Sequence, residues 1–208
     1  MAGHIFDTNT LRNFALADAL GVLVKVCASR RLVSRAVRSE LRRGMHGYAR
    51  ANSDRIAHPP WSLYATRFHG LEAALGQLGF EDAGISDSGE HELQRRILAY
   101  LIDGDRLHAG EAESLAIAAC SGFAFYTDEA AVHGVGATLW EEFGDALLAA
   151  GRRGPVPVHS SAWILLEAVK SSKLTMDRAE DIFDEMREVW ERHPRKTLRA
   201  LKRVKGYW

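Results

Sequence analysis

The chain has 208 residues, 47% hydrophobic and 26% charged, with a formal net charge of zero. This length suits one domain with its own core, or a domain with an insertion, and the neutral total confines any nucleic-acid surface to a local patch. No run approaches the roughly 18 apolar residues of a membrane span, and no signal-peptide pattern opens the chain. We therefore expect a cytoplasmic protein without membrane contact. Cys27 and Cys120 lie in apolar helical contexts and are expected to be reduced core residues.

Four short apolar segments predict strands, at residues 4–6, 32–33, 123–126 and 156–158. They do not alternate with polar residues, as is typical of strands buried on both faces of a parallel sheet. Helical patterns lie at residues 10–28, 34–43, 111–121, 161–168 and 177–192, with Ser34 as a cap and Gly122 as a stop. This alternation predicts an α/β fold, an α/β/α sandwich around a short parallel sheet.

The region from about residue 45 to 105 departs from this pattern. It has no convincing strand, and its apolar residues repeat at helical spacing around a turn-rich stretch, DAGISDSG. We interpret it as a helical insertion within a domain spanning residues 1–190. Residues 191–208 form a separate basic C-terminal segment.

Carboxylates follow the predicted strands or open the helices beside them. Asp7 and Asp128 come directly after strands, Glu40 lies on the helix after the second strand, and Glu111 and Glu113 open another helix. Each alone has a structural explanation, since Asp caps helices and Glu favours their first turn. Ligands of parallel α/β sheets bind beyond the carboxyl ends of the strands. Several carboxylates there would repel one another unless a divalent cation such as Mg²⁺ or Mn²⁺ compensates them.

The stretches FDTNTL, VSRAVRSEL, GEAESLAIA and FYTDEA, in this order, resemble the PIN-domain family. The later VPVHSSAWILLEAVKSSKLTMDRAEDIFDEM resembles the tail of VapC-like toxins within that family. The resemblance covers residues 1–44 and about 106–190. It implies a Mg²⁺- or Mn²⁺-dependent ribonuclease, most in keeping with the toxin of a toxin–antitoxin pair, with a small antitoxin as partner and a homodimeric state. A PIN nuclease in RNA processing or defence is the alternative.

The resemblance assigns four catalytic, metal-binding carboxylates, Asp7, Glu40, Glu113 and Asp128. Glu111 and Glu113 both lie in GEAE, and residues two apart on a helix point about 200° apart, so they cannot both face the metal squarely. Glu111 is the substitute for Glu113. We favour Glu113 for the SLAIAA that follows it. Asn9 and Thr127 are expected to support the site. The implied reaction is hydrolysis of an RNA phosphodiester by activated water, with no protein nucleophile.

Arginine and lysine side chains are the expected contacts to the RNA backbone. Some lie near the proposed cleft by sequence and the rest lie in the basic C-terminal segment, which could equally be a solvated helix end. These residues are Arg12, Arg38, Arg42, Arg195, Lys196, Arg199, Lys202 and Arg203.

Three other functions compete with the nuclease. A haloacid-dehalogenase-like phosphatase also begins with a strand and an Asp, but it needs a second Asp where this chain has Asn9. A dinucleotide-binding fold needs a glycine-rich first turn, and DTNTLRN has no glycine. A PIN-like module that has lost catalysis and only binds a partner stays open, and an activity assay decides it.

Overall fold

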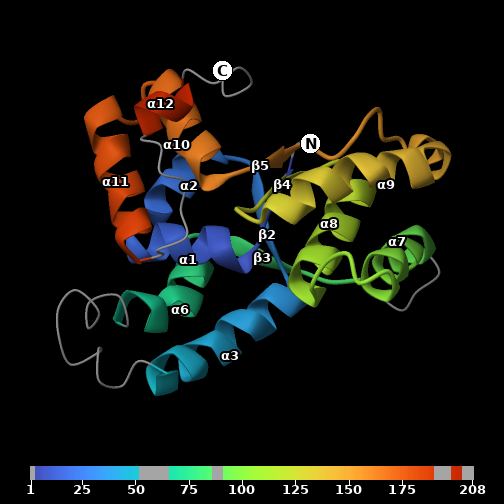
Figure 1. Ribbon diagram of the computed structural model, residues 1–208, viewed down its shortest axis with the longest axis horizontal. Helices are drawn as coiled ribbons and strands as arrows, with labels where there is room; N and C mark the ends of the chain where they lie inside the picture. The colour runs from blue at the N-terminus through green and yellow to red at the C-terminus, as the bar shows by residue number, and fades with distance from the viewer. Residues whose placement is uncertain (1–2, 52–65, 86–90, 190–197, 203–208) are drawn as a thin grey trace.

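The computed structural model describes residues 3–51, 66–85, 91–189 and 198–202 (Figure 1). Five strands form one sheet, in the order β3-β2-β1-β4-β5, and every neighbouring pair is parallel. The strands are β1 (Gly3–Phe6), β2 (Arg30–Ser34), β3 (Phe80–Ala83), β4 (Ala124–Tyr126) and β5 (Val158–His159). The helices are α1 (Thr8–Leu16), α2 (Leu20–Val26), α3 (Arg35–Ala51), α6 (Leu71–Gln77), α7 (Glu92–Asp103), α8 (Ala109–Ser121), α9 (Ala130–Ala149), α10 (Ser161–Lys170), α11 (Met176–Val189) and α12 (Leu198–Lys202).

Helices cover both faces of the sheet. Successive strand residues point to opposite faces, so neighbouring residues of one strand enter different cores. Phe6, Val33 and Tyr126 face a core built with α1, α2, α10 and α11. Ile5 and Phe125 face a second core built with α7, α8 and α9. In Figure 1 the two sets of helices lie on either side of the central strands. The predicted α/β class with a parallel sheet and helices on both faces is confirmed.

The region predicted to be a helical insertion contains a strand, so the expectation that residues 45–105 lack one is wrong. Strand β3 pairs with β2, Phe80 opposite Arg31 and Ala83 opposite Ser34. Its sequence, FEDA, carries two acids, which is unusual for a buried strand but acceptable at a sheet edge. Arginines on the neighbouring elements compensate them, through the ion pairs Arg30–Glu81 and Arg38–Asp82, each at 2.7 Å.

Two helical regions differ from the prediction. The single helix expected over residues 10–28 is two helices, α1 and α2, separated at Asp18, whose φ of 50° is incompatible with a right-handed helix. The second difference is the GVGA stretch at residues 134–137, which suggests a loop by its two glycines but lies within the long helix α9. A Cβ on Gly136 would meet Val158 of β5 at 3.3 Å, so glycine there lets α9 approach the sheet edge closely.

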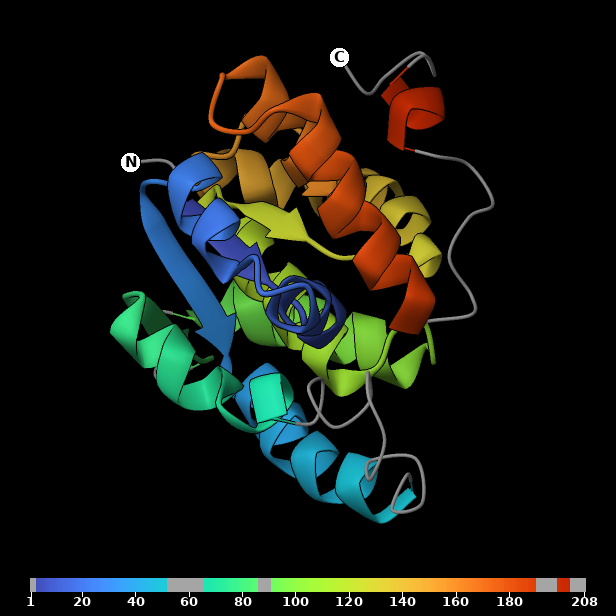
Figure 2. The ribbon, with the colours of Figure 1, turned by 90° about the vertical axis from the view of Figure 1, so that its left-hand side faces the viewer.

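The C-terminal part packs onto the first core. Leu198 of α12 is fully buried, and α12 contacts both α10 and α11. Figure 2 shows α3 and α6 together at the opposite end of the molecule. Cys27 is buried and Cys120 half-buried, neither in a disulfide, and burial raises the pKa of each thiol to about 11. Among the described helices, none is long and apolar enough to cross a membrane.

Candidate functional site

A cavity of about 320 Å³ opens at the carboxyl edge of the sheet, where β1 and β4 lie side by side. The strand order runs from β1 towards β3 on one side and continues with β4 on the other, so the cavity lies at the switch point where parallel sheets bind ligands. We call it the acidic pocket. It is lined by Asp7, Thr8, Asn9, Arg12, Glu40, His108, Glu111 and Glu129.

Asp7 is the most deeply buried carboxylate of the acidic pocket, with only 2% of its surface exposed. It both caps a helix and faces the cavity: Oδ1 accepts the Thr10 N–H at 2.7 Å, and Oδ2 accepts the Thr127 hydroxyl at 2.5 Å. The pKa of Asp7 is raised to about 7, because burial and, to a smaller extent, the charge of Asp128 outweigh the opposing effect of these hydrogen bonds. The expected support from Thr127 is therefore a direct hydrogen bond.

Glu40 reaches the acidic pocket from α3. Its Oε2 accepts the Thr8 hydroxyl at 2.5 Å, and its Oε1 accepts the Gly110 N–H at 3.1 Å. Gly110 lies in the first turn of α8, where free backbone N–H groups and the helix dipole favour an anion. One carboxylate of α3 thus joins the first residues of α1 to the first turn of α8.

The two glutamates of GEAE take different positions. Glu111 lines the acidic pocket, and its Oε2 accepts the His108 N–H at 3.0 Å. Burial raises the pKa of Glu111, and the charges of Glu129 and Glu40 raise it further. Glu113 instead accepts the Ala36 N–H at 2.7 Å and so caps the first turn of α3. This placement favours Glu111 as the pocket carboxylate, although Glu113 was preferred from the sequence.

The two acids after β4 also separate. Glu129 lines the acidic pocket, and its Oε1 accepts the Asn9 side-chain N–H at 2.8 Å. Asp128 lies outside the lining: it accepts the backbone N–H of Ser161 at 2.8 Å and the side-chain N–H of Asn13 at 2.7 Å. Sequence reasoning missed Glu129. The two consecutive acids of FYTDEA were the available signal, since either could turn toward the cleft once the strand ends.

Four carboxylates from four segments of the chain therefore line one cavity, namely Asp7, Glu40, Glu111 and Glu129. Oxygen donors of this kind are those that hard divalent cations prefer. Burial is the main cause of the raised pKa values of Asp7 and Glu111, and neighbouring carboxylates add a smaller contribution. Within the described ranges, no three His, Cys, Asp or Glu side chains lie close enough together to form a ligand group. The donor types fit a divalent cation, whereas the side chains as they lie do not enclose one.

The arginines predicted to contact RNA have different surroundings. Arg12 lines the acidic pocket, and its guanidinium lies 4.9 Å from the centre of the Phe68 ring. Arg38 pairs with Asp82, and Arg42 with Glu72 at 2.7 Å, so both are tied to the side of the sheet that carries β3. Arg199 pairs with Asp177 and with Glu180. Lys202 lies in α12, and Arg195, Lys196 and Arg203 lie outside the described residues.

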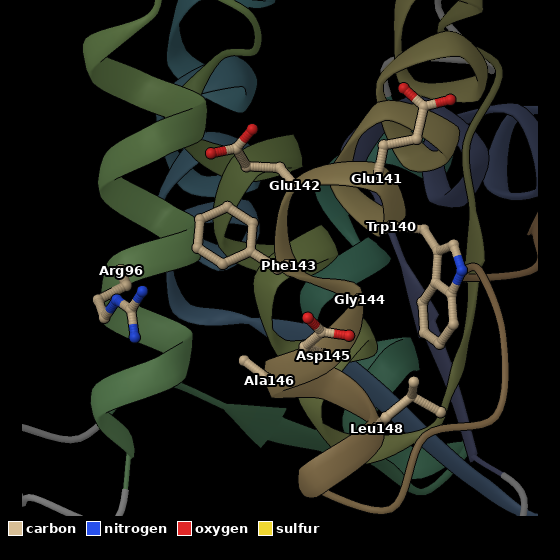
Figure 3. Close-up of a pocket in the computed structure, with 9 residues that line it drawn as sticks. All are labelled: Arg96, Trp140, Glu141, Glu142, Phe143, Gly144, Asp145, Ala146 and Leu148. Carbon is tan, nitrogen blue, oxygen red and sulfur yellow. The ribbon is translucent and has the colours of Figure 1, made fainter.

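A larger hollow, of about 410 Å³, lies elsewhere, between α7 and α9 (Figure 3). Its lining combines the acids Glu141, Glu142 and Asp145 with Trp140 and Leu148, and Arg96 faces the Phe143 ring across it. None of the carboxylates at the strand ends reaches it. The smaller acidic pocket is therefore the candidate site.

Replacing Gly110 by alanine is expected to disturb the acidic pocket with little effect on the fold. A Cβ on Gly110 would lie 2.5 Å from Glu40 Oε1, so the flexible Glu40 side chain has to move away. We expect at least a roughly tenfold loss of any metal-dependent activity, because a misplaced ligand group weakens metal binding about 10- to 100-fold. Gly134→Ala is the matched control, since a Cβ at Gly134 meets nothing within 4 Å. Equal activity of the two variants would contradict a role for Glu40.

The geometry brings together Asp7, Glu40 and Glu111 of the predicted site, adds Glu129, and holds Glu113 and Asp128 in structural hydrogen bonds. The resemblance to the PIN-domain family rests on the motifs of the sequence. Comparisons of the chain with protein-family models, with curated proteins and with solved structures found no match.

Proposed function

We propose that this protein is a metal-dependent ribonuclease with a PIN-like site. The observation that carries the proposal is the meeting of four carboxylates, from four separate segments, in one cavity at the switch point of a parallel sheet. The order of the sequence motifs supports it independently. A divalent cation bound there would activate water and stabilise negative charge on a phosphodiester.

In this proposal the residues of the acidic pocket have different roles. Asp7, Glu40, Glu111 and Glu129 hold Mg²⁺ or Mn²⁺. Asn9 orients Glu129, and Thr127 fixes the Asp7 carboxylate in one direction by hydrogen bonding. The remaining cationic side chain of the lining, Arg12, is placed to contact a phosphate of the strand.

The test is cleavage of single-stranded RNA by the purified chain, with Mg²⁺ or Mn²⁺ and with chelator. We expect cleavage that requires the metal and is lost in Glu129→Gln, which keeps the size of the side chain and removes its charge. Absence of cleavage for every RNA, together with absence of divalent-ion binding, would refute the nuclease. The interaction module would then be the better interpretation, and the lack of a formed ligand group among the described residues is the observation that favours it.

The toxin role, with an antitoxin partner and a homodimeric state in the cytoplasm, rests on the resemblance to VapC-like proteins. It predicts that expression in a host cell arrests growth and that co-expression of a cognate antitoxin relieves the arrest. Growth at the normal rate, with RNA cleavage intact in vitro, would instead support a nuclease of RNA processing or defence.

A further inference from the structure

A second cavity, of about 230 Å³, adjoins the acidic pocket. The two share His108, Glu111 and Glu129 in their linings, so they lie next to each other, and we call the two cavities together the groove. We call the second cavity the flanking pocket. It is lined by Asp105, Arg106, Leu107, His108, Glu111, Glu129 and Ala131.

Arg106 is an exposed cation on the wall of the flanking pocket. Its guanidinium lies over the Tyr100 ring, 4.1 Å from the ring centre, and donates a hydrogen bond to the Tyr100 carbonyl at 3.1 Å. Among the described residues it forms no ion pair. A guanidinium held by an aromatic ring keeps donors available and loses little freedom on binding an anion.

The loop that carries Arg106 has a defined shape. The N–H groups of Asp105 and Arg106 donate to the carbonyls of Ile102 and Leu101 at the end of α7, at 2.9 and 3.1 Å. Asp105 adopts a left-handed conformation, with φ of 49°, which Asp tolerates better than most residues. Arg106 is therefore presented to the groove from a backbone anchored on one side by α7 and on the other by α8.

The charges along the groove give Arg106 a specific role. The carboxylates of both pockets repel phosphate, so a strand can lie there only where cations offset them. Arg12 is the arginine of the acidic pocket and Arg106 that of the flanking pocket.

We propose that the flanking pocket binds the nucleotide next to the cleaved bond of a single-stranded RNA, with Arg106 holding its phosphate and His108 at the boundary between the two subsites. This inference rests on the proposed function, which supplies the strand. It adds a second subsite and assigns a residue that the sequence motifs do not mark. A single strand is the form of RNA whose phosphates and bases are both accessible to protein side chains.

The experiment compares a short single-stranded RNA with copies in which one phosphate next to the scissile bond is replaced by a neutral methylphosphonate. Binding is measured with chelator present, and cleavage with Mg²⁺. For the wild type we expect one neutral position to weaken binding about tenfold, the size of one charged hydrogen bond. In Arg106→Ala the same replacement should cost little, and the slope of log K against log[salt] should decrease in magnitude by roughly 0.7, the share of one phosphate contact.

Two further variants separate recognition from folding. Arg106→Lys keeps the charge, so it should recover the salt slope and part of the affinity. Arg153→Ala removes an exposed arginine beyond the far end of α9 and should behave as the wild type.

The outcomes distinguish the two proposals. If the wild type cleaves RNA but tolerates every neutral phosphate equally, the flanking subsite is refuted and the nuclease stands. If the wild type binds with the expected phosphate and Arg106 dependence but cleaves nothing, the subsite stands and the nuclease is refuted. If it neither binds nor cleaves, both fall.

Discussion

Replacing Asp7 by asparagine is expected to abolish RNA cleavage and, at the same time, to stabilise the protein above pH 7. Asparagine has nearly the same shape, and its carbonyl can still accept the Thr10 N–H. It cannot supply the negative charge that holds a divalent cation. We expect the rate of cleavage to fall at least roughly 100-fold, since a metal ion contributes several kcal/mol to such reactions.

The gain in stability follows from the raised pKa of Asp7. The folded protein holds its proton up to about pH 7, whereas the unfolded chain releases it near 3.8. Stability is therefore lost as the pH rises between these two values, by roughly 4 kcal/mol in total. The asparagine side chain of the variant does not titrate. The stability difference between variant and wild type should be small below pH 4, grow with pH and level off above 7.

Thermal unfolding in chelator, from pH 4 to 8, measures this difference. Addition of Mg²⁺ at pH 8 should then raise the Tm of the wild type more than that of Asp7→Asn, because the cation compensates the buried charge. A variant that is less stable than the wild type at pH 8, or that cleaves RNA at the wild-type rate, would remove Asp7 from the centre of the site.

The matched pair Glu111→Gln and Glu113→Gln should separate a functional carboxylate from a structural one. Glu111 lines the acidic pocket, so its variant should lose cleavage at least roughly tenfold. Its folding should be retained, because glutamine can still accept the His108 N–H. Glu113 caps α3 through the Ala36 N–H, and its charge also favours the helix dipole.

Glu113→Gln should therefore unfold more easily, by about 0.5 to 1 kcal/mol, and cleave RNA at close to the wild-type rate. Urea unfolding and a cleavage assay on the same preparations measure both effects. Loss of cleavage in Glu113→Gln with unchanged urea unfolding would restore the assignment that the sequence motif favoured.

The sequence predicts where β1, β2 and β4 lie, because each contains a short apolar stretch that suits a strand of a buried sheet. It does not reveal β3, since Glu81 and Asp82 break the apolar run. Arg30 and Arg38 neutralise the charges of these two acids, and each arginine lies about 50 residues before its partner in the chain. Local pattern cannot show a strand whose acids are neutralised only in the folded protein.

The candidate site was also predicted only in part. The order of the motifs predicts that carboxylates gather at the sheet edge, and Asp7, Glu40 and Glu111 line one pocket. Which member of each close pair points inward is a question of one or two backbone angles. Glu111 and Glu113 differ by their rotation around α8, and Asp128 and Glu129 by how the chain leaves β4. Neither angle is encoded in residue type alone, because aspartate and glutamate suit both positions.

The central position of β1 sets the order in which the molecule can be completed during synthesis. One edge of β1 pairs with β2, which begins at Arg30. Its other edge stays unpaired until β4, which begins at Ala124, has been synthesised. Until then Asp7 lacks the Thr127 hydroxyl and Glu129 has not been made. A nascent chain can thus build the β1–β2–β3 half of the sheet early, since the N-terminal parts of a protein fold first. The acidic pocket arises only after more than half of the chain has been translated, so a ribosome carries this protein through most of its synthesis without a complete acidic centre.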